Sequence, residues 1–293
     1  MSIVNRIWNM PPRDIARKIR RRLSGDRSID LEEILTSPKH MRPQRGYDFF
    51  SRYEAIISRT HDWQPINFEG ARVLEIGSGP VLGFGPMALF RGAAHYTAVE
   101  PDFDDRILDD DRFTGGYLDG VHKDLSGLFG VGMTLAELAA RVKDHTRIVR
   151  EYLLDADLGG PFDIVLSNSC LEHISPFGPS LRALHKFCAP DCRFVHLVDF
   201  GSHRPGENPF QDIYNIDRAA YAEQYGQLIN LLRPSEVLKE MREAGFDAGF
   251  TPYYSMPENF TGPLHASWSS RFAEDELFTK AGIIFGPLGG RND

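Results

Sequence analysis

The sequence predicts an α/β fold built on an open, mostly parallel sheet, and three observations lead to this prediction. A short apolar strand over 72–76 runs directly into the turn Gly77-Ser78-Gly79. A second strand over 95–99 ends on an acid, Glu100. Further apolar runs alternate with helical patterns, which is typical of parallel sheets covered by helices on both faces.

The glycine turn does not fit a diphosphate ligand. A dinucleotide fingerprint needs a third glycine where Leu82 stands, and the Gly-Lys-Ser/Thr of a phosphate loop is absent. Glu100 follows Gly79 by 21 residues, close to the spacing of about 20 at which such an acid meets ribose hydroxyls. We therefore expect a nucleoside ligand without pyrophosphate. Its predicted contacts in this part of the chain are Glu75, Gly77, Ser78, Gly79 and Glu100.

Composition and charge narrow the class of protein. The chain has 293 residues, 42% of them hydrophobic and 25% charged, and a net charge of −8, which argues against a general nucleic-acid binder. Its three cysteines fit a reducing compartment. Cys188 and Cys192 are four residues apart, but the sequence shows no second ligand pair, so structural thiols are favoured over zinc and no metal site is assigned. No apolar run approaches the ~18 residues of a membrane span, and the N-terminus lacks a signal-peptide core. A cytoplasmic protein is expected.

Residues 1–62 are predicted to form an N-terminal basic, helical appendage to a domain over 63–293. Seven basic residues and one acid lie in 1–25, and Ile15, Ile19 and Leu23 form a narrow apolar stripe within 11–23. Such a helix can lie on an anionic membrane surface, or pack its stripe on the domain or a partner subunit. The stripe is short, which favours packing.

The order of motifs resembles the class I S-adenosylmethionine-dependent methyltransferases. The resemblance rests on Glu-x-Gly-x-Gly at 75–79, the acid-tipped second strand, Asp155-Ala156, and a Phe-Asp-apolar strand from Phe162 that leads to Leu-Glu-His at 171–173. It implies a Rossmann-like, seven-stranded, mostly parallel sheet and S-adenosyl-L-methionine as cofactor. A third strand is predicted over 151–157.

In that resemblance Asp155 accepts a hydrogen bond from the adenine amine and the backbone of Ala156 meets the ring. Ser167 and Asn168 end the fourth strand, where open α/β sheets hold ligands.

About fifty residues, 100–150, separate the second strand from the third, and we predict an insertion or lid there. Its first part, 102–111, holds six aspartates without the alternation of a calcium loop, which favours a solvated acidic loop. A helix is predicted over 134–149. Two final strands, 250–254 and 277–285, are expected to form the antiparallel hairpin that closes the sheet.

The acceptor side resembles a narrower group, methyltransferases associated with bacterial polysaccharide and cell-surface glycan biosynthesis. The carrying residues are Asp199-x-x-x-His203 and Asn230-x-x-Arg233. This implies O-methylation of a sugar in a glycan or glycan precursor, because an imidazole near neutral pKa can take the proton that a hydroxyl loses.

His203 is the preferred base with Asp199 orienting it, and His173 is the second candidate. A divalent ion at Asp199 and His203 is the alternative that remains open at this point. Asn230, Arg233 and Tyr47 are the predicted acceptor-binding residues. The alternative functions are methylation of another small-molecule oxygen or nitrogen, and a non-catalytic module that binds S-adenosylmethionine.

Overall fold

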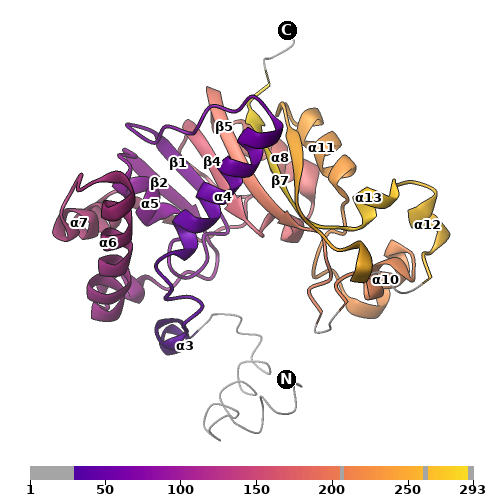
Figure 1. Cartoon of the computed structure of the whole chain (residues 1–293), viewed down its shortest axis with the longest axis horizontal. Coiled ribbons are helices and arrows are strands. Elements are labelled where there is room, and N and C mark those ends of the chain that lie inside the picture. The colour runs from indigo at the N-terminus through magenta and orange to yellow at the C-terminus, as the bar shows by residue number, and fades with distance from the viewer. Residues whose placement is uncertain (1–29, 205–207, 260–262, 290–293) are drawn as a thin grey trace, which may run out of the picture.

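The computed structural model describes residues 30–204, 208–259 and 263–289. It contains a seven-stranded sheet with the order β3-β2-β1-β4-β5-β7-β6 (Figure 1). β7 runs antiparallel to both β5 and β6, and the other neighbouring pairs are parallel. The predicted sheet and its closing hairpin are thereby confirmed. The strands are β1 (Arg72–Ile76), β2 (His95–Val99), β3 (Thr146–Val149), β4 (Phe162–Asn168), β5 (Cys188–Asp199), β6 (Gly249–Ser255) and β7 (Thr279–Pro287).

Alternate side chains of the central strands enter two separate hydrophobic cores, one on each face of the sheet. On one face Val73 and Ile164 pack with α4 (Arg45–Thr60), α5 (Gly85–Phe90), α6 (Leu118–Phe129) and α7 (Leu135–Asp144). On the other face Leu74 and Val165 pack with α8 (Phe177–His185) and α11 (Pro234–Glu243). Strands buried on both faces explain the continuous apolar runs in the sequence.

The third strand is not where the sequence placed it. β3 is Thr146–Val149, whereas the predicted strand over 151–157 is a loop. The helix predicted over 134–149 ends earlier, because α7 closes at Asp144 and the chain then turns into the sheet. Thr146 and Ile148 carry β-branched side chains, which suit a strand, and β3 pairs with β2 from Tyr96↔Thr146 to Val99↔Val149.

The segment between β2 and β3 is helical. It holds the short helices η1 (Asp105–Asp109) and η2 (Arg112–Tyr117) before α6 and α7. In Figure 1, α6 and α7 lie at the opposite end of the molecule from α10 (Arg218–Tyr225), α12 (Ala266–Ser269) and α13 (Glu274–Leu277). Tyr53 and Phe50 of α4 belong to the same core as β1, so this helix packs within the domain although the sequence assigned it to an appendage. The helix predicted over 11–23 lies outside the described residues.

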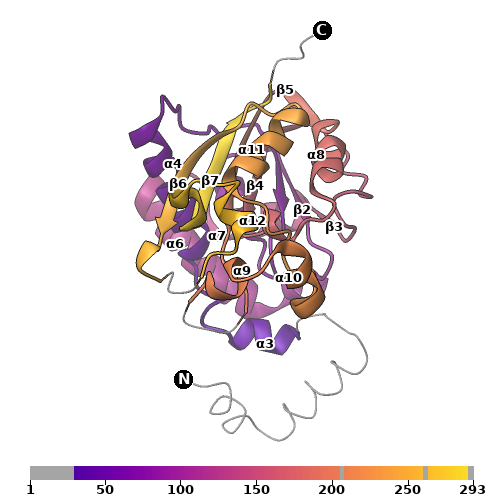
Figure 2. The same cartoon turned by 90° about the vertical axis from the view of Figure 1, so that its right-hand side faces the viewer.

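A third, smaller core gathers the segments that follow β5 and β6. Phe210, Tyr214, Tyr221 and Trp268 are its largest buried residues. Figure 2 shows α9 (Gln211–Tyr214), α10 and α12 grouped together beside the sheet. The remaining short helices are α3 (Leu31–Thr36), η3 (Leu171–His173) and η4 (Pro257–Asn259). Across the described ranges no helix is both long and apolar enough to cross a membrane.

Candidate functional site

The glycine turn and the end of β2 are joined directly. Gly77 and Gly79 have φ values of 69° and 67°, in the left-handed region that favours glycine. The amide of Gly77 donates to the carbonyl of Val99 at 2.8 Å, and the amide of Gly79 donates to Oε2 of Glu100 at 2.8 Å. Burial raises the pKa of Glu100, and the Gly79 amide acts against that rise. Glu100 thus fixes the turn with one oxygen while it lines a cavity beside it.

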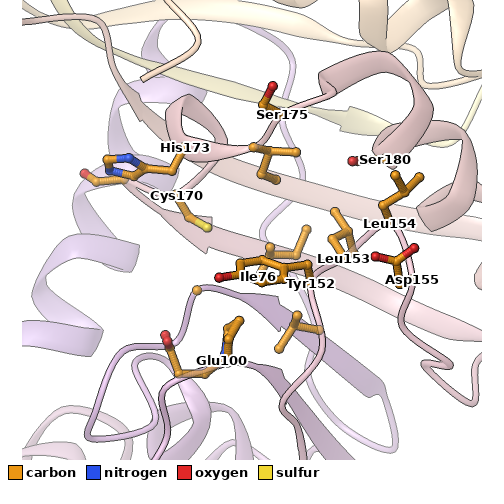
Figure 3. A pocket seen from close by; sticks show the side chains of 15 residues that line it. Ile76, Glu100, Tyr152, Leu153, Leu154, Asp155, Cys170, His173, Ser175 and Ser180 are labelled. Atoms are coloured by element: carbon orange, nitrogen blue, oxygen red, sulfur yellow. The ribbon is translucent and has the colours of Figure 1, made fainter. Parts of the chain in front are cut away.

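That cavity has a volume of about 500 Å³ and lies at the carboxyl ends of β1, β2 and β4. Gly77, Glu100, Asp155 and His173 line it, together with Tyr152, Leu153 and Leu154 from the loop after β3. Figure 3 shows Glu100, Asp155 and His173 on three sides of the cavity. No residue between Pro101 and Tyr152 is part of its lining, so the insertion after β2 does not form a lid in this structure.

The cavity suits S-adenosylmethionine in its chemistry. Glu100 offers carboxylate oxygens for ribose hydroxyls, and Asp155 offers them for an amine. The exposed ring of Tyr152 and the side chains of Leu153 and Leu154 give apolar walls for a purine. A Cβ added at Gly77 would lie 2.5 Å from Sγ of Cys170, so only glycine fits this wall.

Three predicted cofactor contacts do not reach the cavity. Glu75 is 1% exposed, and its Oε2 accepts from the Phe84 amide at 2.8 Å and the Tyr96 hydroxyl at 2.7 Å. Burial raises the pKa of Glu75 to about 8. Ser167 is fully buried beside Nδ1 of His196 at 2.9 Å, and Oδ1 of Asn168 accepts from the Tyr53 hydroxyl at 3.0 Å.

β4 ends at Asn168 as expected, but the side chains of Ser167 and Asn168 contact His196 and Tyr53 instead of the cavity. Ser169 then takes a φ of 53°, and Ser169 and Cys170 line the cavity instead. Three other predicted contacts, Ser78, Gly79 and Ala156, are also outside the lining. Ser78 and Ala156 are 6% and 7% exposed and flank the lining residues Gly77 and Asp155, and Gly79 donates its amide to Glu100.

His173 connects the cavity to a second group of polar side chains. The rings of His173 and His203 lie 4.7 Å apart between centroids. Nε2 of His203 lies 3.8 Å from Oε1 of Glu172 and 3.7 Å from Oδ2 of Asp199. Burial lowers the pKa of His203, and the charge of Asp199 opposes this. Asp199, which the sequence analysis expected beside His203, and His173, the second candidate base, thus lie in one group with His203.

Two further residues of this group were missed by sequence reasoning. Lys280 of β7 forms an ion pair with Oδ1 of Asp199. Glu172 is 3% exposed, and burial raises its pKa to about 8 while the amides of Glu172 and Asp199 lower it. The Leu-Glu-His pattern was visible, but the direction of Glu172 toward His203 depends on the tight turn of η3 and carries no sequence signal.

Asn230 and Arg233, two of the predicted acceptor-binding residues, do not line the cavity and instead form hydrogen bonds within the protein. The side-chain amide of Asn230 donates to the carbonyls of Leu171 at 2.9 Å and Ile174 at 3.2 Å, so it holds the segment that carries Glu172 and His173. Arg233 is 1% exposed and donates to the Phe200 carbonyl at 2.8 Å and the Tyr214 hydroxyl at 2.7 Å. Both side chains donate their hydrogen bonds to groups inside the protein. This corrects the prediction that Asn230 and Arg233 orient an acceptor.

Tyr47 is likewise a core residue. It is 8% exposed and packs with the α4 face of the sheet. Burial and a hydrogen bond with Asp124 raise the pKa of Tyr47 to about 12. The acceptor contact predicted for Tyr47 is therefore not supported.

The chain is similar to solved structures of methyltransferases. A methyltransferase from Mesorhizobium loti that depends on S-adenosylmethionine is 15% identical, with 76% of this chain and 93% of that chain aligned and a TM-score of 0.44. A Haemonchus contortus phosphoethanolamine N-methyltransferase solved with S-adenosyl-L-methionine is 12% identical over 89% of this chain and 59% of that chain, with a TM-score of 0.47. No curated protein matches in sequence.

The family is shown by the sequence itself. Residues 46–248 match the family described as a methyltransferase domain. This range runs from α4 to the residue before β6. It includes the glycine turn, Glu100, Asp155 and the group around His173 except Lys280. The chain therefore belongs to this methyltransferase family and is an enzyme that uses S-adenosyl-L-methionine.

Proposed function

We propose that this enzyme transfers the methyl group of S-adenosylmethionine to a hydroxyl group of a sugar in a glycan or glycan precursor. One observation supports the proposal above others: His173 is shared by the cofactor cavity and by the group that contains His203, Glu172 and Asp199. An acceptor in front of these side chains would lie next to the cavity, as an in-line displacement at the methyl carbon requires.

The proposed chemistry is a displacement at carbon. The acceptor oxygen forms a bond to the methyl carbon while the carbon–sulfur bond breaks, and the electron pair of that bond stays on sulfur. The hydroxyl proton passes to the imidazole of His203, which is the candidate base. Asp199, whose Oδ2 lies 3.7 Å from Nε2 of that ring and which pairs with Lys280, is a positioning residue for the ring. His173 remains the second candidate.

The direct test is incubation with methyl-labelled S-adenosylmethionine and fractionated cell-envelope precursors, followed by mass analysis. We expect label on sugar hydroxyls. Label confined to amines or phenols would replace the proposal with another small-molecule methyltransferase, and cofactor binding without transfer to any fraction would favour a module that only binds.

A matched pair of variants tests the base. His203→Ala is expected to slow transfer by roughly 10²–10⁴-fold, the usual contribution of a general base, while cofactor affinity is kept. His95→Ala, an exposed histidine at the start of β2, serves as the control. Transfer by His203→Ala at the rate of the control would remove His203 from this role.

A further inference from the structure

The described parts of the chain bring three metal-binding side chains to one point beside the cofactor cavity. Glu172, His173 and His203 each offer one ligand atom, and these atoms lie within 4.8 Å of one another. Metal–ligand bonds of about 2.0–2.2 Å place ligand atoms roughly 3–4 Å apart, so a shift of about 1 Å closes the site. We propose that Glu172, His173 and His203 bind a divalent transition-metal ion.

Glu172 gives an independent reason to expect a cation. Its side chain is 3% exposed, and neither carboxylate oxygen accepts a hydrogen bond of normal length and angle from the described residues. Lys280, the nearby cation, is engaged with Asp199 instead. Buried carboxylates are normally paired or bound to a metal, and a divalent ion between Glu172 and the two imidazoles supplies the missing charge.

His173 is oriented as a metal ligand. Its Nδ1 lies 2.8 Å from the carbonyl of Leu228, which can only accept, so Nδ1 of the neutral ring carries the proton. Nε2 is then left with its lone pair, which is the state a metal requires. A backbone carbonyl behind the ring is the usual second contact of a metal-bound histidine, and Asn230 fixes the segment from the other side.

The ligand set selects the kind of ion. Two imidazoles and one carboxylate suit zinc, iron, cobalt or nickel, whereas magnesium and calcium prefer sets made of oxygen. Three protein ligands also leave coordination positions open. Next to the cavity such positions could take the hydroxyl oxygens of an acceptor, and this part of the inference rests on the proposed function.

The ion and the base are alternative uses of His203, because a nitrogen bound to metal cannot accept a proton. In the loaded enzyme the ion would bind the acceptor oxygen and lower the pKa of its hydroxyl. The proton would then leave to solvent on the exposed side of His173 and His203, and the methyl transfer would otherwise proceed as described.

The experiment measures binding alone, without cofactor or acceptor. The full chain is stripped with a chelator and titrated with Zn²⁺ by calorimetry and with Co²⁺ by visible absorption. We expect one ion per chain. His173→Ala, His203→Ala and Glu172→Gln should each weaken binding more than about 10-fold, since even second-shell losses cost roughly 10–100-fold. His95→Ala should bind as the wild type does.

Absence of binding, or equal affinity in the three ligand variants and the control, overturns the metal site. If Glu172→Gln fails to fold in thermal melting, the two exposed histidines carry the test. Binding without methyl transfer to any sugar keeps the metal site and removes the proposed function. If the chain binds no ion and chelation does not affect transfer, the metal site is rejected and His203 stays the candidate base.

Discussion

Glu100 has two functions in the site, and one substitution tests both of them. Its carboxylate holds the amide of Gly79 and lines the cavity where the ribose of the cofactor would lie. Glu100→Ala removes both contacts, and a hydrogen bond to a charged group contributes about 1.5–3 kcal/mol. We expect the calorimetric dissociation constant for S-adenosylhomocysteine to rise by about 10-fold or more. Glu151→Gln, an exposed acid on the loop beside the cavity, is the control, and equal affinities would reject the ribose role.

Glu75 makes stability depend on pH in the opposite direction from most carboxylates. Burial raises its folded pKa from the ordinary 4.5 to about 8, so the folded chain holds a proton that the unfolded chain has lost. The stability that this group contributes is complete below pH 4.5 and is lost as the pH rises toward 8. Compared with Glu75→Gln, the wild type should lose up to about 1.4 kcal/mol of unfolding free energy per pH unit in that window.

Urea denaturation of both proteins at pH 5.5, 6.5 and 7.5 measures this difference. A difference between wild type and Glu75→Gln that stays constant across the three values would show that Glu75 is ionised in the folded protein. The carboxylate packs closely against the segment after the glycine turn, since a Cβ added at Gly83 would lie 2.1 Å from Oε1 of Glu75. The buried acid therefore holds the segment around Gly83 and Phe84.

At the scale of elements, the two glycines of the turn differ although they share a backbone conformation. Both have positive φ, which costs another residue about 1–2 kcal/mol. An added Cβ at Gly79 meets nothing within 4 Å, whereas one at Gly77 meets Cys170 at 2.5 Å. Gly79→Ala should lower the free energy of unfolding by the strain alone, and Gly77→Ala by clearly more. Equal losses in chemical denaturation would contradict the close contact between β1's turn and η3.

Arg233 links α11 to the third core. Its guanidinium donates to Phe200 and Tyr214 and lies over the rings of Phe200, Tyr214 and Trp268 at 5.6–5.7 Å. Losing two charge-assisted hydrogen bonds should cost about 3 kcal/mol or more of unfolding free energy in Arg233→Ala. Arg233→Lys should not restore it, because an ammonium lacks the planar fork. Wild-type stability in Arg233→Ala would instead support the acceptor contact expected from the sequence.

The sequence predicted elements better than it predicted side-chain directions. The strand patterns at 72–76, 95–99 and 162–168 are strong because these strands are buried on both faces. β3 is an edge strand of four residues with exposed Arg147, so its pattern was weak and the apolar Leu153 and Leu154 beyond it were mistaken for the strand. The loop that contains Leu153 and Leu154 lines the cavity. Asp155 therefore lies at the cavity although it belongs to a loop and not to the predicted strand.

Side-chain directions decided the remaining errors. Asn230 and Arg233 are polar residues near a ligand-binding edge, and nothing in a single sequence shows that their donors are used by carbonyls of Leu171 and Phe200. Glu172 was the reverse case, since its neighbours His173 and His203 are thirty residues apart and meet only through the fold. Roles that depend on long-range contacts are visible only in the structure.

At the scale of the whole molecule, the sheet separates the helical insertion from the site. α6 and α7 pack against α5 on one face, while η3 and the third core border the carboxyl edge where the cavity lies. For residues 11–23, packing on the domain or a partner subunit stays the favoured prediction and contact with a membrane surface the alternative. The chain thus has a donor seat, which is the cavity at the glycine turn, a proposed acceptor region beyond His173, and supporting helices.

Hydrogen exchange followed by mass spectrometry, with and without S-adenosylhomocysteine, tests this division most directly. The account predicts slower exchange in 76–80, 152–156 and 169–175, the segments that line the cavity, and no change in 102–144. Saturating ligand that leaves those three segments unchanged, or that protects chiefly the α6–α7 insertion, would contradict the placement of the donor seat and with it the acceptor region beside His173.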